Sequence, residues 1–404
     1  MTSAAFRIAC KRESTVITRF GPGEEIYAFD HAGRLFTAWR GNRLYRRALD
    51  GRTMEKHTDR TGRHPRRFRR FLEPAECRSL VEEAAATARE ALAALSRSEA
   101  EVIWSLPGPE RSDQVRQLVT AAGRFTAEAA EADRRRFESV YTPVAILPPD
   151  RYLALVVQVT EGCHWNQCTF CSFYRDRPFR VKPYEEFVRH LEDVIAFFGN
   201  GLSLRRGVFL GDANALLLPT ELLVPRLDHL RGRLPGLAED ISAFVDVFTG
   251  HRRQSTDLAP LSGRGLRRIY AGLESGDDEL LAFLNKPQTA AECVELVHVA
   301  KAAGLRVGVI VMAGIGGRAY WKRHVTATVA TIAQMRLGAG DLAYVSAFEA
   351  PSRGPYAERA RAAGIGALDQ TEVADQADEL LRAIAGVVEP GARVAPYDIQ
   401  EFLY

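Results

Sequence analysis

Three cysteines stand close together in a chain that has only six. Cys163, Cys168 and Cys171 fall within "TEGCHWNQCTFC", in the spacing C-x4-C-x2-C. Such spacing lets one loop wrap a metal centre, and thiolates bind either zinc or an iron–sulfur cluster. A closed zinc site or a self-contained cubane takes four protein ligands, but His164 is too close to Cys163 to serve easily as the fourth. The spacing therefore predicts a centre with one open coordination position.

The segment before the cysteines must position them. "YLALVVQVT" is a continuous apolar run with β-branched residues, which is typical of a strand buried on both faces. Five more runs alternate with helical segments: "GVFLG", "ISAFVDVFT", "LRRIYAGLE", "LRVGVIVMA" and "DLAYVSAFE". This alternation predicts an α/β fold of parallel βαβ units, either a doubly wound sheet or a full or partial barrel. In both folds ligands bind at the carboxyl ends of the strands, where the cysteine loop begins.

The chain before this region follows other patterns. Residues 1–50 alternate apolar and polar side chains and predict two or three antiparallel strands. The basic stretch at 52–71 is expected to be a solvated connector, or else a contact for RNA, because Phe68 and Phe71 interleave with arginines. Helices are expected from Pro74 to about residue 95 and over residues 112–137.

Three segments follow from these patterns. Residues 1–147 are predicted to form an α+β extension, with a small sheet followed by helices. The proline-rich "YTPVAILPPD" marks the start of an α/β core at residues 148–350. Residues 351–404 are predicted to form a C-terminal helix and tail.

Composition narrows the class of protein. The 404 residues are 46% hydrophobic and 26% charged, as in ordinary globular proteins, and the net charge of +3 is too small to indicate nucleic acid by itself. No apolar run is long enough to span a bilayer, and "MTSAAFRIACKREST" lacks the hydrophobic core of a secretory signal. We therefore expect a cytoplasmic protein without membrane contact, whose clustered thiols are reduced and bind a metal.

The region from about residue 150 to 350 resembles the radical S-adenosylmethionine (radical SAM) superfamily. Its usual signature, C-x3-C-x-aromatic-C, follows the first strand of a partial (β/α)6 barrel. Phe170 supplies the aromatic residue, and one extra residue separates Cys163 from Cys168. The resemblance implies that the three thiolates hold three irons of a [4Fe–4S] cluster. The fourth iron then binds the amino and carboxylate groups of S-adenosylmethionine, and one electron cleaves this cofactor to a 5′-deoxyadenosyl radical.

The same resemblance implies cofactor contacts after the second and third strands. Gly211 would allow close approach of the backbone, and Asp212, helped by Asn214, would receive the cofactor ammonium. Helix capping is the alternative role for these two polar residues. Asp246 is predicted to lie within the third strand and to face the barrel interior, as a cofactor or substrate contact or as a satisfied structural acid.

Further contacts are implied by "RRIYAGLESGDDELLAFLNKPQT" and by the glycines after the fifth strand. Glu274, with Ser275 beside it, matches a residue that contacts the ribose in related enzymes. Lys286 matches a basic residue that pairs with the cofactor carboxylate, and a solvated helix end is the alternative. Gly314 would let the backbone approach the adenine. Arg175 and Arg177, which follow the third cysteine, either shield the cluster charge, meet an anionic substrate or lie on the surface.

The resulting hypothesis is a radical SAM enzyme that abstracts a hydrogen atom from an unidentified small molecule. Its expected partners are that substrate and an electron donor of the flavodoxin or ferredoxin type. RNA modification by the same chemistry is one alternative, although nucleic acid is not the expected partner. A non-catalytic protein that binds zinc or an iron–sulfur cluster is the other. Residues that act on the substrate itself are not identified by the sequence.

Overall fold

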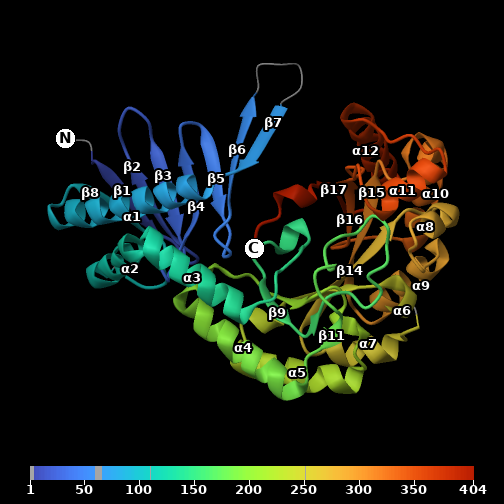
Figure 1. The fold of residues 1–404 in the computed structure, drawn as a ribbon. Helices are drawn as coiled ribbons and strands as arrows, with labels where there is room; N and C mark the ends of the chain where they lie inside the picture. The colour runs from blue at the N-terminus through green and yellow to red at the C-terminus, as the bar shows by residue number, and fades with distance from the viewer. Residues whose placement is uncertain (1–3, 60–65, 110, 251) are drawn as a thin grey trace. The chain divides into compact units, whose positions relative to one another are not determined.

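The computed structural model describes residues 4–59, 66–109, 111–250 and 252–404, and the chain forms two compact units (Figure 1). The first unit comprises Met1–Pro143, Glu192–Arg205 and Leu403–Tyr404. The second comprises Val144–Leu191 and Arg206–Phe402. Each unit contains a large sheet of its own.

The first unit is built on an eight-stranded sheet of order β7-β6-β5-β4-β3-β2-β1-β8. Strands β1 to β7 form an antiparallel meander, and β8 lies parallel to β1. The strands are β1 (Phe6–Cys10), β2 (Thr15–Arg19), β3 (Glu25–Phe29), β4 (Leu35–Arg40), β5 (Arg43–Arg47), β6 (Thr53–Asp59), β7 (Arg66–Phe71) and β8 (Ala100–Trp104). Two or three strands were predicted in residues 1–50, and this number is wrong because five lie there. Strands as short as β1 and β2 show too few alternations to be recognised from the pattern.

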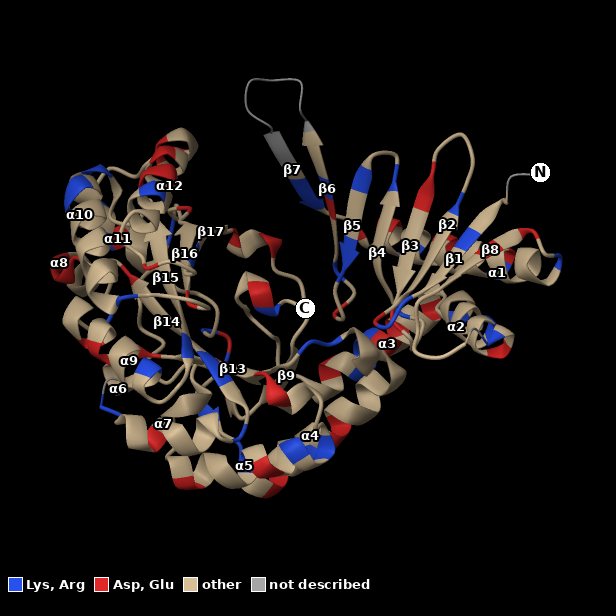
Figure 2. Cartoon of the chain, turned by 180° about the vertical axis from the view of Figure 1, so that it is seen from behind, with Lys and Arg blue, Asp and Glu red and all other residues tan. Residues whose placement is uncertain are grey.

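The basic stretch at 52–71 is not a connector. Its described residues form β6 and β7, which pair with each other, while residues 60–65 of the stretch lie outside the described residues. The interleaving of arginine with Phe68 and Phe71 is thus the alternation of a strand. Basic residues are visible on β7, at one edge of the sheet (Figure 2). Charged side chains on an edge strand discourage pairing with a strand of another molecule.

Helices cover one face of this sheet. α1 (Pro74–Ser96) begins with a capping box and with proline in its first turn, and its buried alanines and Leu80 pack against Ile8, Ile17 and Tyr27. Two helices, α2 (Ser112–Arg124) and α3 (Ala127–Val140), replace the single one predicted over 112–137. The break occurs because the side chain of Thr126 accepts a hydrogen bond from the Ala129 amide and so caps a new helix.

The second unit contains a seven-stranded parallel sheet in which each strand pairs with the next along the chain. The strands are β9 (Leu155–Gln158), β12 (Val208–Gly211), β13 (Ile241–Val245), β14 (Leu266–Glu274), β15 (Arg306–Ala313), β16 (Leu342–Ala347) and β17 (Arg393–Tyr397). A doubly wound sheet reverses its strand order at a switch point, and this sheet does not. The sequential order is that of an open barrel, which confirms the predicted α/β class and fits a partial barrel.

Helices connect these strands and lie along the outer side of the sheet (Figure 1). They are α4 (Tyr184–Phe198), α5 (Thr220–Arg233), α6 (Val247–Gly250), α7 (Ser255–Ser262), α8 (Asp278–Phe283), α9 (Ala290–Ala302), α10 (Gly317–Met335), α11 (Pro355–Ala362) and α12 (Gln370–Ala385). In the described residues, no helix has both the length and the apolar character needed to cross a bilayer.

The amino-terminal half of the inner sheet face is filled by the protein itself. Asp150, just before β9, accepts hydrogen bonds from the hydroxyls of Tyr270 and Tyr344, at 2.6 and 2.9 Å, and from Arg268 at 2.9 Å. The ring of Phe244 lies 6.1 Å from that of Tyr270 on the neighbouring strand. A site for ligands is therefore expected at the opposite, carboxyl ends of the strands.

Candidate functional site

The three cysteines lie on a loop at the carboxyl end of β9, where the sequence placed them. The chain continues from β9 into β10 (Thr160–Glu161) and returns through β11 (Arg180–Val181), which pairs antiparallel with β10. Residues 162–179, called the cluster loop below, lie between these short strands. Arg180 donates two hydrogen bonds to Glu161, at 2.6 and 2.9 Å, and Lys182 donates to the same carboxylate. The base of the loop is thus closed by charge pairs as well as by backbone pairing.

The cluster loop is docked onto the end of α8. The amide of Thr169 donates to the carbonyl of Leu284 at 2.9 Å, and the indole of Trp165 donates to the carbonyl of Asn285 at 2.9 Å. In return, the side-chain amide of Asn285 donates to the carbonyl of Gln167 at 2.9 Å. These bonds fix the loop beside the residue that follows Asn285, which is Lys286.

The environment of the thiols suits a positively charged metal centre. Burial raises the pKa of Cys168 to about 12, and burial likewise raises the pKa of Cys171. Charge on Cys163 raises both pKa values further, so the three thiols interact electrostatically. A bound metal reverses this preference, because its charge stabilises the thiolate form. All six cysteines of the chain are free of disulfides.

In the described residues no three His, Cys, Asp or Glu side chains form a group that could hold one metal ion. The thiolates of a cubane each bind a different iron, so a cluster does not require them to converge on one point. The partly buried, mutually interacting thiols of one docked loop therefore fit the iron–sulfur cluster that the resemblance implies.

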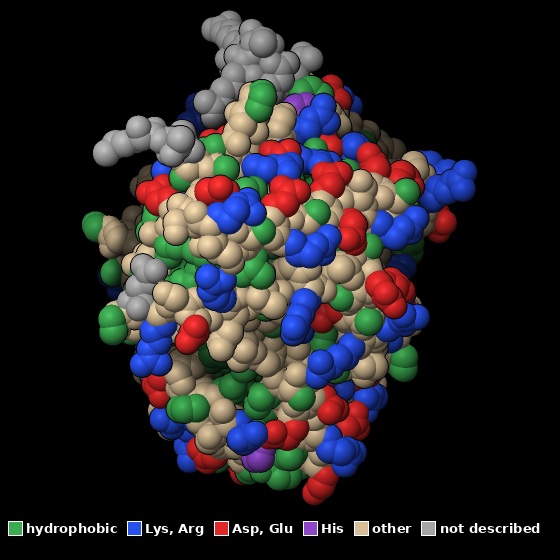
Figure 3. All heavy atoms as spheres, turned by 90° about the vertical axis from the view of Figure 1, so that its left-hand side faces the viewer, with side chains coloured by type: hydrophobic (Ala, Val, Ile, Leu, Met, Phe, Trp, Pro, Cys, Tyr) green, Lys and Arg blue, Asp and Glu red, His purple; other side chains and the backbone are tan. Residues whose placement is uncertain are grey.

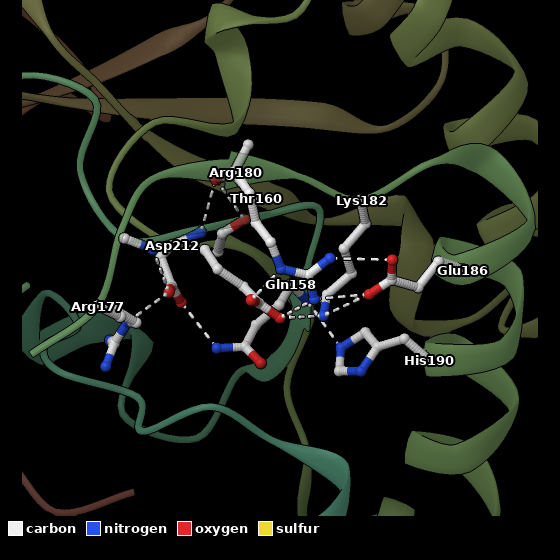
Figure 4. A network of polar contacts seen from close by, with 11 residues as sticks. Gln158, Thr160, Arg177, Arg180, Lys182, Glu186, His190 and Asp212 are labelled. Atoms are coloured by element: carbon white, nitrogen blue, oxygen red, sulfur yellow. Dashed lines mark hydrogen bonds and ion pairs between the residues drawn. The ribbon is translucent and has the colours of Figure 1, made fainter.

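Asp212, at the end of β12, anchors the start of the cluster loop (Figure 4). Its carboxylate accepts hydrogen bonds from the side-chain amide of Gln158 at 2.8 Å and from the backbone of Gly162 at 3.1 Å. The Arg177 guanidinium lies 3.5 Å from it. Burial raises the pKa of Asp212 to about 6. The space beside Gly211, just before it, is lined by side chains of β9. The predicted contact of Asp212 with the cofactor ammonium stays a prediction.

Asp246 does not lie within a strand, and that part of the prediction is wrong. β13 ends at Val245, and Asp246 accepts hydrogen bonds from the backbone and hydroxyl of Thr249, at 2.8 and 2.5 Å. The Asp246 side chain accepts hydrogen bonds from the turn that follows it. Such local hydrogen bonds end the strand, although the neighbouring residues are apolar. Asn214 donates to Asp246, and His164 lies 3.5 Å from it. The structure thus brings two of the predicted residues together, next to the cluster loop.

The end of β14 carries an ion pair that the sequence did not predict. Lys286 donates to the Glu274 carboxylate at 2.6 Å and to the carbonyl of Gly272 at 2.7 Å. Burial opposes the charge on Lys286, but Glu274 and Cys168 outweigh it and raise its pKa. Glu274 has φ +60°, a left-handed conformation that costs energy and often marks a functional residue. The ion pair therefore lies within electrostatic reach of the cluster loop.

Ser275, Phe170 and Gly314 have protein partners. The hydroxyl of Ser275 lies 2.8 Å from a ring nitrogen of His324. Phe170 packs against an apolar cluster that contains Met312. Gly314 has φ +91°, and a side chain there would come within 2.9 Å of α12. Whether these three residues also contact a cofactor stays a prediction.

Gln158 is the site residue that the sequence reasoning missed. It is fully buried at the end of β9, in the otherwise apolar run "LALVVQV". A polar side chain in a strand buried on both faces needs a partner, and this was the signal that could have identified it. The partner is Asp212, so Gln158 links β9 to the acid that anchors the cluster loop.

Comparisons with known proteins agree with this geometry. A family model described as Radical SAM superfamily matches residues 157–328. The 4′-phospho-dehydrooxetanocin synthase of Priestia megaterium is 24% identical over 172 residues, which is 39% of this chain. The chain spans about a quarter of the length of that curated relative, with 23% of it covered.

Two solved structures are also similar to the chain. Coproporphyrinogen III oxidase (HemN) from Escherichia coli has a TM-score of 0.42 and 15% identity, with 62% of this chain and 55% of that chain covered. Methylornithine synthase (PylB) has a TM-score of 0.42 and 15% identity, with coverage of 78% and 84% respectively. On the strength of its family-model match, the chain contains a Radical SAM domain at residues 157–328, and enzymes with this domain bind a [4Fe–4S] cluster and S-adenosylmethionine.

Proposed function

We propose that Cys163, Cys168 and Cys171 bind three irons of a [4Fe–4S] cluster and that the enzyme acts on a small molecule. When bound, the cluster and S-adenosylmethionine supply a 5′-deoxyadenosyl radical that abstracts a hydrogen atom from the substrate. One observation carries the proposal: hydrogen bonds to the carbonyls of Leu284 and Asn285 hold the cluster loop beside Lys286, which pairs with Glu274 at the end of β14. A metal-binding loop and a buried charge pair thus meet at the carboxyl ends of the strands, where this class of fold binds its ligands.

Two groups are suited to hold the cofactor's methionine moiety. Lys286 has three N–H donors, and Gly272 and Glu274 accept from it in the described structure. The remaining donor direction suits the cofactor carboxylate. Asn214 is 1% exposed, and its side-chain oxygen has no hydrogen-bond partner among the described residues. A buried acceptor without a partner is costly, so a ligand donor such as the cofactor ammonium would stabilise it.

The other assignments remain parts of the same proposal. Asp212 orders the loop entrance and is proposed to receive the ammonium with the help of Asn214, while Asp246 fixes the Asn214 amide. Glu274 and Ser275 are proposed to lie near the ribose, Gly314 near the adenine, and Phe170 beside the cofactor. The segment Met1–Pro143 of the first unit lies outside the matched residues 157–328, and we propose that it helps to define the substrate.

Anaerobic reconstitution tests the proposal. The wild-type protein should gain close to four irons per chain and should release 5′-deoxyadenosine when dithionite and S-adenosylmethionine are added. Cys168→Ala should lose this product to the background level. Cys77→Ala is the matched control, because Cys77 is a partly buried free cysteine on α1, and it should behave as wild type. Equal product from Cys168→Ala and wild type would refute the cluster assignment.

Enzymes of this superfamily need a reductant as well as a substrate. We propose a flavodoxin- or ferredoxin-type protein as the electron donor, and a cytoplasmic location, in keeping with six free cysteines. Replacing dithionite by reduced flavodoxin in the same assay tests the first point. Cell fractionation tests the second.

RNA as the substrate stays a second, weaker candidate. On β7 the charge of Arg70 is already compensated, because it donates to Glu76 at 2.7 and 2.8 Å and to Glu55 at 3.0 Å. Basic and acidic side chains are interspersed on the face seen in Figure 3. Transfer RNA binding that weakens steeply with salt would support an RNA substrate, and no binding at low salt would exclude it.

The enzyme assignment argues against a non-catalytic metal-binding protein. Metal analysis after anaerobic purification separates the two. Stoichiometric zinc without iron would support the non-catalytic role, and iron with sulfide would support the cluster.

A further inference from the structure

Arg175 contacts the backbone of two of the three cysteines. Its Nε donates to the carbonyl of Cys171 at 2.8 Å, and its Nη2 donates to the carbonyl of Cys168 at 3.0 Å. The amide of Cys171 also donates to the carbonyl of Cys168 at 3.2 Å, which closes a turn between the two residues. One planar guanidinium therefore bridges both carbonyls of this turn, a geometry that arginine provides and lysine does not.

The charge of Arg175 differs from the other charges near the thiols. Lys286 is paired with Glu274 at 2.6 Å, and Arg177 lies 2.8 Å from Asp176. In the described parts of the chain, the contacts of Arg175 are with carbonyl oxygens and not with a carboxylate. A cation beside an iron–sulfur centre favours the reduced form, because reduction adds one negative charge to the centre.

We propose that Arg175 is a positioning residue that holds the Cys168–Cys171 turn in shape and makes the bound cluster easier to reduce. This inference rests on the proposed cluster role of the three cysteines. It assigns to Arg175 the charge-shielding role that was one of three open alternatives. The proposed effect is on the reduction of the cluster by one electron, and the reductant is the only other reactant required.

Two substitutions separate the shape of the turn from the charge. Arg175→Gln removes the charge, and Arg175→Lys keeps it but cannot bridge both carbonyls. Arg382→Gln is the matched control, because the Arg382 Nε donates to the carbonyl four residues earlier, at 3.0 Å, as Arg175 does, but on α12. The readouts are cluster retention during chelator challenge and the reduced fraction in a redox titration followed by electron paramagnetic resonance.

The expected results differ for each variant. Arg175→Gln should show an about tenfold lower reduced-to-oxidised ratio at a fixed potential, which corresponds to about 59 mV for one electron. Arg175→Lys should keep the wild-type ratio but lose its cluster faster to the chelator. Arg382→Gln should match wild type in both readouts. A wild-type ratio in Arg175→Gln, together with wild-type retention in Arg175→Lys, would overturn the inference. Failure of the wild-type protein to form a cluster would instead refute the proposed function.

Discussion

The ion pair between Lys286 and Glu274 gives the sharpest test of the structural reasoning. Both side chains are 11% exposed and lie 2.6 Å apart. Lys286→Met keeps most of the side-chain volume but removes the charge, and it leaves the Glu274 carboxylate buried without its cation. We expect this variant to destabilise the second unit strongly, because an unpaired buried charge is far more costly than a buried neutral group.

The magnitude follows from the burial of the pair. Removal of one member of a buried ion pair costs about 3–5 kcal/mol. The double variant Lys286→Met with Glu274→Gln removes both charges, so its cost should fall to about 1–2 kcal/mol. The single variant should therefore be less stable than the double one, which is the opposite of additive behaviour. Lys322→Met, on an exposed position of α10, is the control and should change stability by less than about 0.5 kcal/mol.

Hydrogen exchange of the apoprotein under reducing conditions is the suitable measurement. The chain folds as two units, so one global free energy of unfolding is not well defined. Amides of β14 and β15 report the stability around the ion pair alone. Protection in Lys286→Met equal to that of wild type would refute the description of the pair as buried and coupled. The same conclusion would follow if the double variant were less protected than the single one.

Two further predictions use the same part of the chain. Gly272→Ala places a methyl group 2.3 Å from the Glu274 carboxylate and 2.8 Å from Lys286 Nζ, so it should cost about 1–3 kcal/mol, whereas Gly232→Ala, with nothing within 4 Å, should be neutral or slightly stabilising. Hydrogen exchange of amides in the second unit compares the two variants. The pKa of Asp212 is raised from 3.8 to about 6 by burial, so the folded state binds this proton more tightly than the unfolded state does. The free energy of local unfolding of wild type relative to Asp212→Asn, measured by hydrogen exchange of β9 and β12, should therefore fall by about 2 kcal/mol as pH rises from about 4 to 7, and a difference independent of pH would contradict this assignment.

The fold of the second unit was largely predictable from the sequence. Runs such as "LRRIYAGLE" are strands because both faces are buried, and the observed β14 has the predicted bounds. Residue patterns alone could not distinguish a doubly wound sheet from a barrel, because strand order depends on long-range pairing. The partial barrel was predicted from the resemblance to the radical SAM superfamily, which rests on the cysteine spacing.

The site was predictable only in its local part. The three cysteines follow from spacing within one loop, whereas the pairing of Glu274 with Lys286 depends on the irregular end of β14 and on the helix that follows it. The helix break at Thr126 and the end of β13 before Asp246 are decided by single side-chain hydrogen bonds to the backbone. Such bonds compete with strand or helix patterns, and a pattern of apolar residues does not reveal which will win.

The docking of the cluster loop has a consequence for assembly and repair. Thr169, Trp165 and Asn285 hold the loop through backbone, indole and amide groups rather than through thiols. The loop shape is therefore encoded without help from a metal, unlike that of a zinc finger, whose fold is formed by its ion. An enzyme that loses its cluster to oxygen should remain folded and accept a new cluster in place. After oxidative damage, such a protein should be restored by replacement of its cluster and should not need to be synthesised again.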